Sequence, residues 1–210
     1  MAVSLEEPLR TFFTLALLAA LAGCASSSPE ADDTYRKGLS LANSDTAGAI
    51  KIFEEGVGQY PKHHRMRFAL ARLQYDTGET QHLAERDAIA LARTCQDQKR
   101  PQEAQKAERD AQDRHQKALP FYRAARENLR IVAENDPDEA REAWAYELLM
   151  KCDVFFEEYD VAADHLKRAI EMGRPSGAKL SAMQQYLAEL RKENSRHEKG
   201  DILDRMAEHR

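Results

Sequence analysis

The sequence predicts an all-α protein built from successive helical hairpins. Composition, the spacing of apolar residues and internal self-similarity each favour this fold class. Alanine occurs 33 times among the 210 residues, whereas valine and isoleucine together occur 11 times. Alanine loses almost no side-chain entropy in a helix, whereas β-branched residues lose rotamer freedom there. With 42% hydrophobic residues and only nine glycines and seven prolines, the chain is too apolar to remain disordered.

The charge balance argues against one class of partner. Charged residues make up 32% of the chain, and the formal net charge at neutral pH is −5. Nucleic-acid-binding proteins generally need a basic face that displaces counterions from the phosphates. We therefore expect no nucleic-acid partner for this acidic chain.

The first 23 residues have the features of a secretory signal peptide. Residues 11–22 form an uncharged apolar run that is shorter than the roughly 20 residues needed to span a bilayer. A run of this length followed by small residues fits the core and cleavage site of a signal peptide. The segment Leu21-Ala22-Gly23-Cys24 resembles the lipobox of bacterial lipoproteins. That resemblance implies cleavage after Gly23 and attachment of diacylglycerol to Cys24. A cysteine buried in an ordinary N-terminal helix is the alternative.

The residues after the cysteine set the expected location. The tract over residues 24–33 is small, polar and contains a proline, which predicts a flexible tether. Fully extended, its residues span about 30 Å. Ala25 occupies the position at which lipoproteins of the inner membrane tend to carry aspartate. The resemblance therefore implies a lipid anchor in the bacterial outer membrane, on the periplasmic face, with the inner membrane left open.

Four sets of small and apolar residues recur after residue 34, each at offsets of zero, four and seven. Their starting positions differ by 35, 41 and 37 residues, and a proline follows the first, third and fourth starts by 12 or 13 residues. The offsets place each set on one face of a helix. The sets are Ala49, Phe53 and Gly56; Ala84, Ala88 and Leu91; Ala125, Leu129 and Val132; and Ala162, Leu166 and Ala169.

This pattern resembles the tetratricopeptide repeat (TPR), a helix–turn–helix unit of about 34 residues that stacks into an α-solenoid. The resemblance implies about four divergent repeats over residues 34–175, with Gly78 at the turn inside the second unit. Residues 176–210 are then a capping helix, for which Ser176 is the candidate N-cap, and a charged tail. An unrelated helical bundle is the alternative fold.

The third expected unit is anomalous. Residues 102–118 carry a stripe of four alanines but no large apolar residue, and Pro120 interrupts the junction with the next helix. A helix that buries so little is expected to be the least stable part of the array. Two interpretations remain open, namely an arm that orders against a partner and a solvated helix without a dedicated role.

No pattern of catalytic or metal-binding residues emerges. The chain lacks a glycine-rich phosphate loop, an HExxH motif and a GxSxG motif, and its seven histidines lack metal-ligand spacing. We therefore expect neither an enzyme nor a cofactor, and no small-molecule substrate. Cys95 and Cys152 are able to pair in an oxidising periplasm, although Cys152 falls on an apolar stripe and is expected to be a small buried residue. Trp144 and Phe155-Phe156 are expected in the core.

The TPR resemblance also implies where a partner binds. Proteins of this family bind other proteins in a groove lined by the first helices of the repeats. In the second unit, that surface includes Arg65, Phe68, Arg72 and Tyr75. Arginine and aromatic residues are typical of binding hot spots, and arginine suits an extended segment with an acidic residue or a free carboxylate.

The expected function is therefore that of a lipid-anchored periplasmic scaffold or adaptor. Its protein partner belongs to an envelope complex, such as a pilus secretin or the machinery of outer-membrane protein assembly. The alternative function is a structural envelope protein that self-associates through the polar third unit. A role in cell-wall enzymology is a third hypothesis, which requires a pocket of converging carboxylates with raised pKa values.

Overall fold

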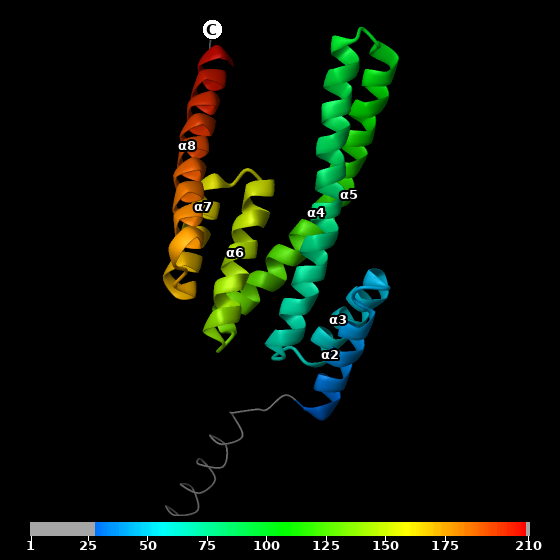
Figure 1. Ribbon diagram of the computed structural model, residues 1–210, viewed down its shortest axis with the longest axis vertical. Helices are drawn as coiled ribbons and strands as arrows, with labels where there is room; N and C mark the ends of the chain where they lie inside the picture. The colour runs from blue at the N-terminus through cyan, green and yellow to red at the C-terminus, as the bar shows by residue number, and fades with distance from the viewer. Residues whose placement is uncertain (1–27, 209–210) are drawn as a thin grey trace, which may run out of the picture.

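The computed structural model describes residues 28–208, and every regular element in this range is an α-helix (Figure 1). Side-chain surroundings are described for residues 28–196. The all-α prediction is thus confirmed. The signal peptide expected over residues 1–23 and the lipid-attachment residue Cys24 lie outside the described residues. The helices are α2 (Pro29–Leu41), α3 (Thr46–Gln59), α4 (His64–Asp97), α5 (Pro101–Asn135), α6 (Glu139–Phe155), α7 (Tyr159–Gly173) and α8 (Gly177–Glu208).

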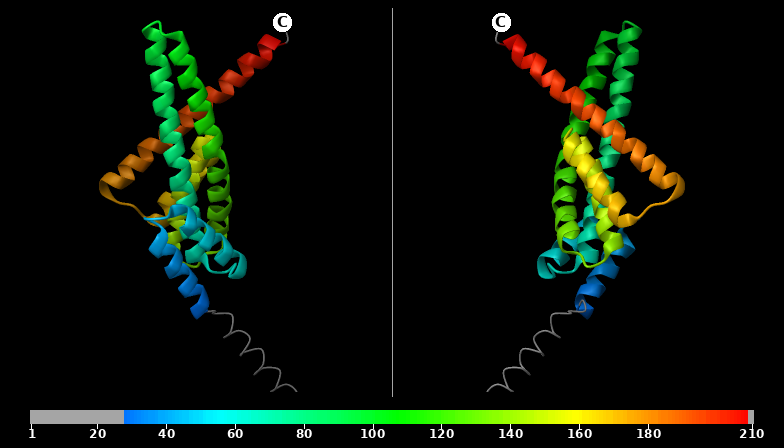
Figure 2. Two further views of the ribbon diagram at one scale, coloured as in Figure 1. Left: turned by 90° about the vertical axis from the view of Figure 1, so that its right-hand side faces the viewer. Right: turned by 90° about the vertical axis from the view of Figure 1, so that its left-hand side faces the viewer.

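Six of these helices form three successive antiparallel hairpins, α2–α3, α4–α5 and α6–α7. Each hairpin packs on the next, because α3 contacts α4 and α5 contacts α6. The first helices also touch one another, α2 against α4 and α4 against α6. Helix α8 packs mainly on α7 and reaches α6 through the ion pair of Lys179 with Glu147 at 2.7 Å, and its C-terminal end extends beyond the three hairpins (Figure 2).

The turn expected at Gly78 is absent, because α4 runs unbroken through this residue. A Cβ atom placed on Gly78 would lie 3.1 Å from the Tyr122 ring and 3.3 Å from Cβ of Phe121. The glycine therefore permits a close approach of α5 to α4 rather than a change of chain direction. As a consequence, the second and third expected units form one long hairpin instead of two short ones.

Pro120 does not end a helix either, since it lies inside the continuous helix α5. A proline removes one helical hydrogen bond and generally costs about 3 kcal/mol in a helix interior. Its neighbours offset this cost, because Ala118 and Tyr122 are both buried in the core that α5 shares with α4 and α6. Tertiary packing thus overrides the local preference.

The outer halves of α4 and α5, residues 83–118, form a two-helix arm that projects away from the other helices and meets α6 at its inner end, where His115 stacks on Phe155 (Figure 1). Gln96 donates to Glu108 at 2.8 Å, and Nδ1 of His115 lies 3.1 Å from Glu85, which fixes the antiparallel register. This register places the alanines of the polar segment against a matching stripe on α4. All are buried: Ala88, Ala92 and Cys95 on α4, and Ala104, Ala107, Ala111 and Ala118 on α5. The segment 102–118 is therefore packed against its own chain.

Helix α2 begins earlier than expected. Oγ of Ser28 accepts a hydrogen bond from the Ala31 amide at 3.2 Å, and Pro29 occupies the first helical position. Both features favour helix initiation, as do acidic side chains in the first turn. Residues 29–33, which were expected to belong to a flexible tether, are consequently helical.

Three buried clusters position the described helices, and one of them packs Met150 of α6 and Leu166 of α7 against Leu190 of α8. The central cluster joins α4, α5 and α6 around Tyr122, Leu129 and Leu149, and a smaller one packs Phe53 of α3 against Met66 and Leu70 of α4. Cys152 belongs to the central cluster, and burial raises the pKa of its thiol. Cys95 is buried in the arm, and both thiols are free.

Candidate protein-binding groove

The first helices of the three hairpins line a shared cavity of about 400 Å³, which we call the first-helix groove. It forms because α4 lies between α2 and α6 and touches both. Its walls combine apolar side chains with three arginines. The lining residues are Tyr35, Leu39, Arg65, Phe68, Ala69, Arg72, Asp138, Ala140, Arg141 and Trp144.

Three of the four residues expected at a binding surface line this groove. Arg65, Phe68 and Arg72 recur every three to four residues on α4 and therefore share one face of the helix. Tyr75 lies elsewhere, and the expectation that it lines the groove is wrong. Its side chain is buried, its ring packs edge-on against Tyr122 at 5.7 Å, and its hydroxyl donates to Glu79 at 3.2 Å.

Trp144 is a groove residue that was expected in the core. Its side chain is 54% exposed, and its ring stacks on Phe68 with centroids 6.3 Å apart. A sequence signal for this position exists, because the apolar face of α6 runs through Ala145 and Leu149 and leaves Trp144 outside it. On the opposite wall, Leu39 of α2 is 46% exposed. The groove therefore offers a surface of exposed apolar and aromatic side chains.

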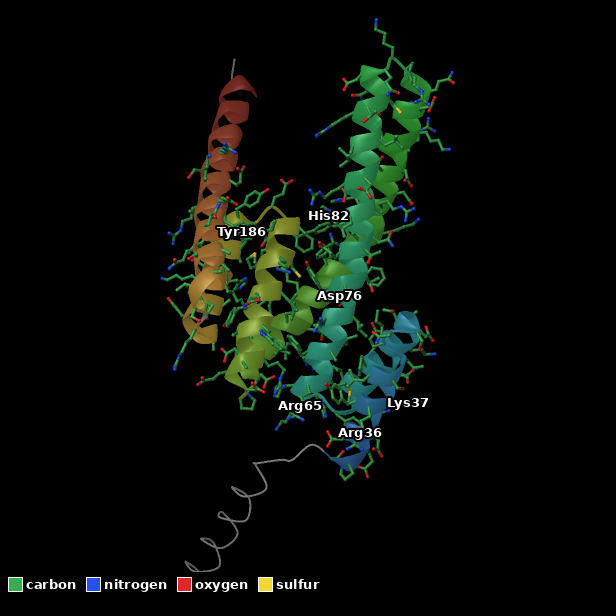
Figure 3. All side chains as sticks on the ribbon, viewed as in Figure 1. Arg36, Lys37, Arg65, Asp76, His82 and Tyr186 are labelled. Atoms are coloured by element: carbon green, nitrogen blue, oxygen red, sulfur yellow. The ribbon has the colours of Figure 1, made fainter. Side chains whose placement is uncertain are left out.

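The arginines of the groove differ in how their charge is compensated. Arg141 pairs with Asp136 and with Asp138, and these partners raise the pKa of its guanidinium. Arg72 lies 3.8 Å from Asp76 in a loose, exposed pair. Arg65 has no ion-pair partner among the described residues, and it lies at the lower end of α4 (Figure 3). Arg65 is thus the cation of this groove that is available to a ligand.

A second cavity of about 510 Å³ adjoins the groove and shares Arg65 and Arg141 with it. We call it the base cavity. It lies between the start of α2, the α3–α4 turn and the α5–α6 turn. Its lining residues are Ser28, Ala31, Tyr60, Pro61, Lys62, His63, His64, Arg65, Asp136, Pro137 and Arg141.

The two histidines of the base cavity have different surroundings. Nδ1 of His63 accepts a hydrogen bond from the Met66 amide at 3.0 Å and caps α4, while Nε2 lies 3.1 Å from Asp32. These contacts assign the proton of a neutral His63 to Nε2. Nδ1 of His64, in contrast, is buried without a hydrogen-bond partner. Burial lowers the pKa of His64 and favours its neutral form.

A buried acid–base cluster lies elsewhere, where α5, α6 and α7 meet. Asp153 is fully buried, with its carboxylate 2.6 Å from Nδ1 of His165 and 2.8 Å from Nε of Arg126. Arg126 also pairs with Glu158 at the start of α7. Since one buried carboxylate faces two basic groups from other helices, we infer that this cluster holds the three helices together.

Neither a metal centre nor a bilayer-spanning helix is evident in the described part of the chain. No three histidine, cysteine or carboxylate side chains between residues 28 and 196 are placed to hold a metal ion. Within the described helices, none combines the length and apolarity needed to cross a membrane. No protein-family model matches the chain, and neither a curated protein nor a solved structure shows significant similarity to it.

Proposed function

We propose that this protein is a lipid-anchored scaffold of the bacterial envelope that binds an extended segment of a partner protein in the first-helix groove. The observation that carries the proposal is the groove itself, in which three non-consecutive helices present exposed Leu39 and Trp144 beside the uncompensated Arg65. Exposed apolar and aromatic side chains next to an available arginine are typical of protein-binding surfaces.

We further propose that the hairpins are three TPR-like units and that the second is extended by the arm. Contacts between successive first helices, as between α2, α4 and α6, support this assignment. In such an array the first helices form a continuous binding surface. The four-unit arrangement loses its basis, because the expected boundaries at Gly78 and Pro120 lie inside helices.

The groove favours a partner segment with two features. An acidic side chain or a free carboxylate would pair with Arg65, since arginine binds carboxylates through two parallel hydrogen bonds. An apolar or aromatic side chain one or two residues away would pack on the stacked rings of Phe68 and Trp144. Anchorage through Cys24 in the outer membrane, with the folded part in the periplasm, rests on the resemblance of residues 21–24 to a lipobox.

The self-associating alternative would have to use the exposed polar face of residues 102–118. The alanine stripe of residues 102–118 is covered by α4, and therefore this stripe is not available to a second copy. The groove, by comparison, is open. We therefore retain the scaffold as the proposed function.

The experiment that tests the groove is a crosslinked pull-down of the full chain from membranes. The test variant combines Arg72→Glu with Trp144→Ala, because both residues line the groove and neither lines the base cavity. The control is Arg86→Glu, an exposed arginine on the arm. We expect the wild type and the control to recover the same envelope protein, and the test variant to recover at least tenfold less. Equal recovery with all three proteins would refute the groove.

A further inference from the structure

We infer that the base cavity is a second binding site, and that it takes the phosphate-bearing headgroup of an anionic phospholipid from the membrane that holds the anchor. The inference rests on the proposed anchoring at Cys24. Three observations carry it, namely the length of chain between Cys24 and the cavity, the charges that line the cavity, and a buried polar atom without a partner.

The first observation is the distance that the chain allows. Ser28, a lining residue of the base cavity, is only four residues from Cys24. Because four residues span at most about 14 Å, an acylated Cys24 keeps the cavity within that reach of the bilayer surface. The early start of α2 at Pro29 removes most of the slack that a longer tether would give.

The arrangement of the helices agrees with this placement. The start of α2, the α3–α4 turn and the α5–α6 turn lie toward the same, lower end of the molecule (Figure 1). The arm points toward the opposite end. A protein held by its N-terminus therefore directs the base cavity toward the membrane and the arm away from it.

The second observation is the uncompensated positive charge of the cavity. Asp136 is its single lining carboxylate and is already paired with Arg141. Lys62 and Arg65 also line the cavity, and neither has an ion-pair partner among the described side chains. Two available cations favour an anionic ligand, and a membrane rich in anionic lipid attracts each of them.

The third observation is the unpartnered Nδ1 of His64. Buried nitrogen atoms of this kind normally have a hydrogen-bond partner, because desolvation without one is unfavourable. His64 lines the cavity next to Arg65. A headgroup with phosphate oxygens and hydroxyls offers acceptors for the two cations, and a rotation of the His64 ring that opens Nδ1 to the cavity would let a hydroxyl donate to it. The exposed rings of Pro61 and Pro137 at the same surface suit the apolar part of a lipid.

The test uses the full chain reconstituted into phosphatidylcholine vesicles that carry a trace of photoactivatable lipid. One set of vesicles contains photoactivatable phosphatidylglycerol, and a second set contains the matching photoactivatable phosphatidylcholine. The test variant is Lys62→Glu, because Lys62 lines the base cavity and not the groove. The matched control is Lys106→Glu, an exposed lysine on the arm with the same change of net charge.

We expect phosphatidylglycerol to label residues 60–65 and 136–141 at least fivefold more than phosphatidylcholine does. Lys62→Glu should reduce this labelling about tenfold, and Lys106→Glu should leave it unchanged. Equal labelling by both lipids, or equal loss in both variants, would overturn the inference. Abolition of the labelling by millimolar inorganic phosphate would also overturn it, because the cavity would then be a site for free anions.

The intact mass of the same preparation separates this inference from the proposed anchor. A mass without acyl groups contradicts the anchor at Cys24. The difference in labelling between the two lipids then tests the base cavity independently of the anchor. Selective labelling of the base cavity without acylation would retain the lipid site and reject the anchor. An acylated chain without selective labelling would retain the anchor and reject the lipid site.

Discussion

At the scale of single residues, Gly78 shows how a missing side chain determines the packing of two helices. The Tyr122 ring lies 3.1 Å from the position that a Cβ atom on Gly78 would take, which is closer than ordinary van der Waals contact. We predict that Gly78→Ala destabilises the protein by about 1–3 kcal/mol, because the buried Tyr122 ring and the Phe121 side chain must move away in a packed core. Urea unfolding of this variant measures the change in the free energy of unfolding.

The matched control is Gly58→Ala. No atom lies within 4 Å of the Cβ position at Gly58, which is an exposed residue of α3. In open helical positions alanine is favoured over glycine by about 0.5–1 kcal/mol. The two substitutions should therefore change stability in opposite directions. Stabilisation by both would show that Gly78 is not in close contact with α5.

His64 gives a prediction for pH. Burial lowers the pKa of His64 in the folded protein, so the unfolded chain binds the proton more readily as the pH falls. The stability contributed by the neutral imidazole is therefore present above the pKa of the unfolded chain and is lost as the pH falls through the folded-state pKa. We predict that His64→Gln loses less stability than the wild type between pH 7 and pH 5. Urea midpoints at the two pH values test this, and equal losses would contradict it.

At the scale of elements, the arm depends on small residues rather than on a large apolar core. The buried alanines of α4 and α5 let the two helices approach closely, and larger side chains would force them apart. Because the arm meets another helix only at its inner end, where His115 stacks on Phe155 of α6, we predict that Ala107→Leu opens it locally and leaves the hairpin α6–α7 intact. Hydrogen exchange should show faster amide exchange within residues 83–118 and unchanged exchange in α6.

The control for the arm is Leu91→Ala. This leucine is 56% exposed, and substitutions at such positions generally change stability by less than about 0.5 kcal/mol. Its exchange pattern should match that of the wild type. Faster exchange throughout the protein with Ala107→Leu would show that the arm is coupled to the body.

The same elements show what the sequence predicts and where it fails. Helical spacing correctly predicted buried faces such as Ala125, Leu129 and Val132, since that pattern depends only on local geometry. The breaks expected at Gly78 and Pro120 were wrong, because the local cost of these residues is outweighed by contacts with distant parts of the chain. Local sequence carries no information about those contacts.

The groove was predicted in part for a related reason. Arg65, Phe68 and Arg72 follow from the spacing along one helix. Trp144 belongs to a helix that comes beside α4 only in the folded protein, and Tyr75 is covered by Tyr122 of α5. Both outcomes depend on which helices become neighbours.

At the scale of the whole molecule, the proposed lipid anchor at Cys24 would determine which end of the fold faces the membrane. A thioether bond between Cys24 and diacylglycerol would consume the thiol of Cys24, whereas Cys95 and Cys152 are free and buried. We predict that the folded protein, extracted from membranes, reacts with no thiol reagent, because burial shields both side chains and raises the pKa of Cys152. In denaturant, the acylated protein should titrate two thiols.

The Cys24→Ser variant is the control for this titration, and it should also show two thiols in denaturant. Three thiols in the wild type would mean that Cys24 is unmodified. The base cavity would then have no acyl group to hold it near the bilayer. The orientation of the arm relative to the membrane would also not be fixed. Two thiols in both proteins, with the lipid found by intact mass, would place the groove within a short distance of the membrane. A partner segment would then have to reach the groove from the membrane surface or from a complex embedded in it.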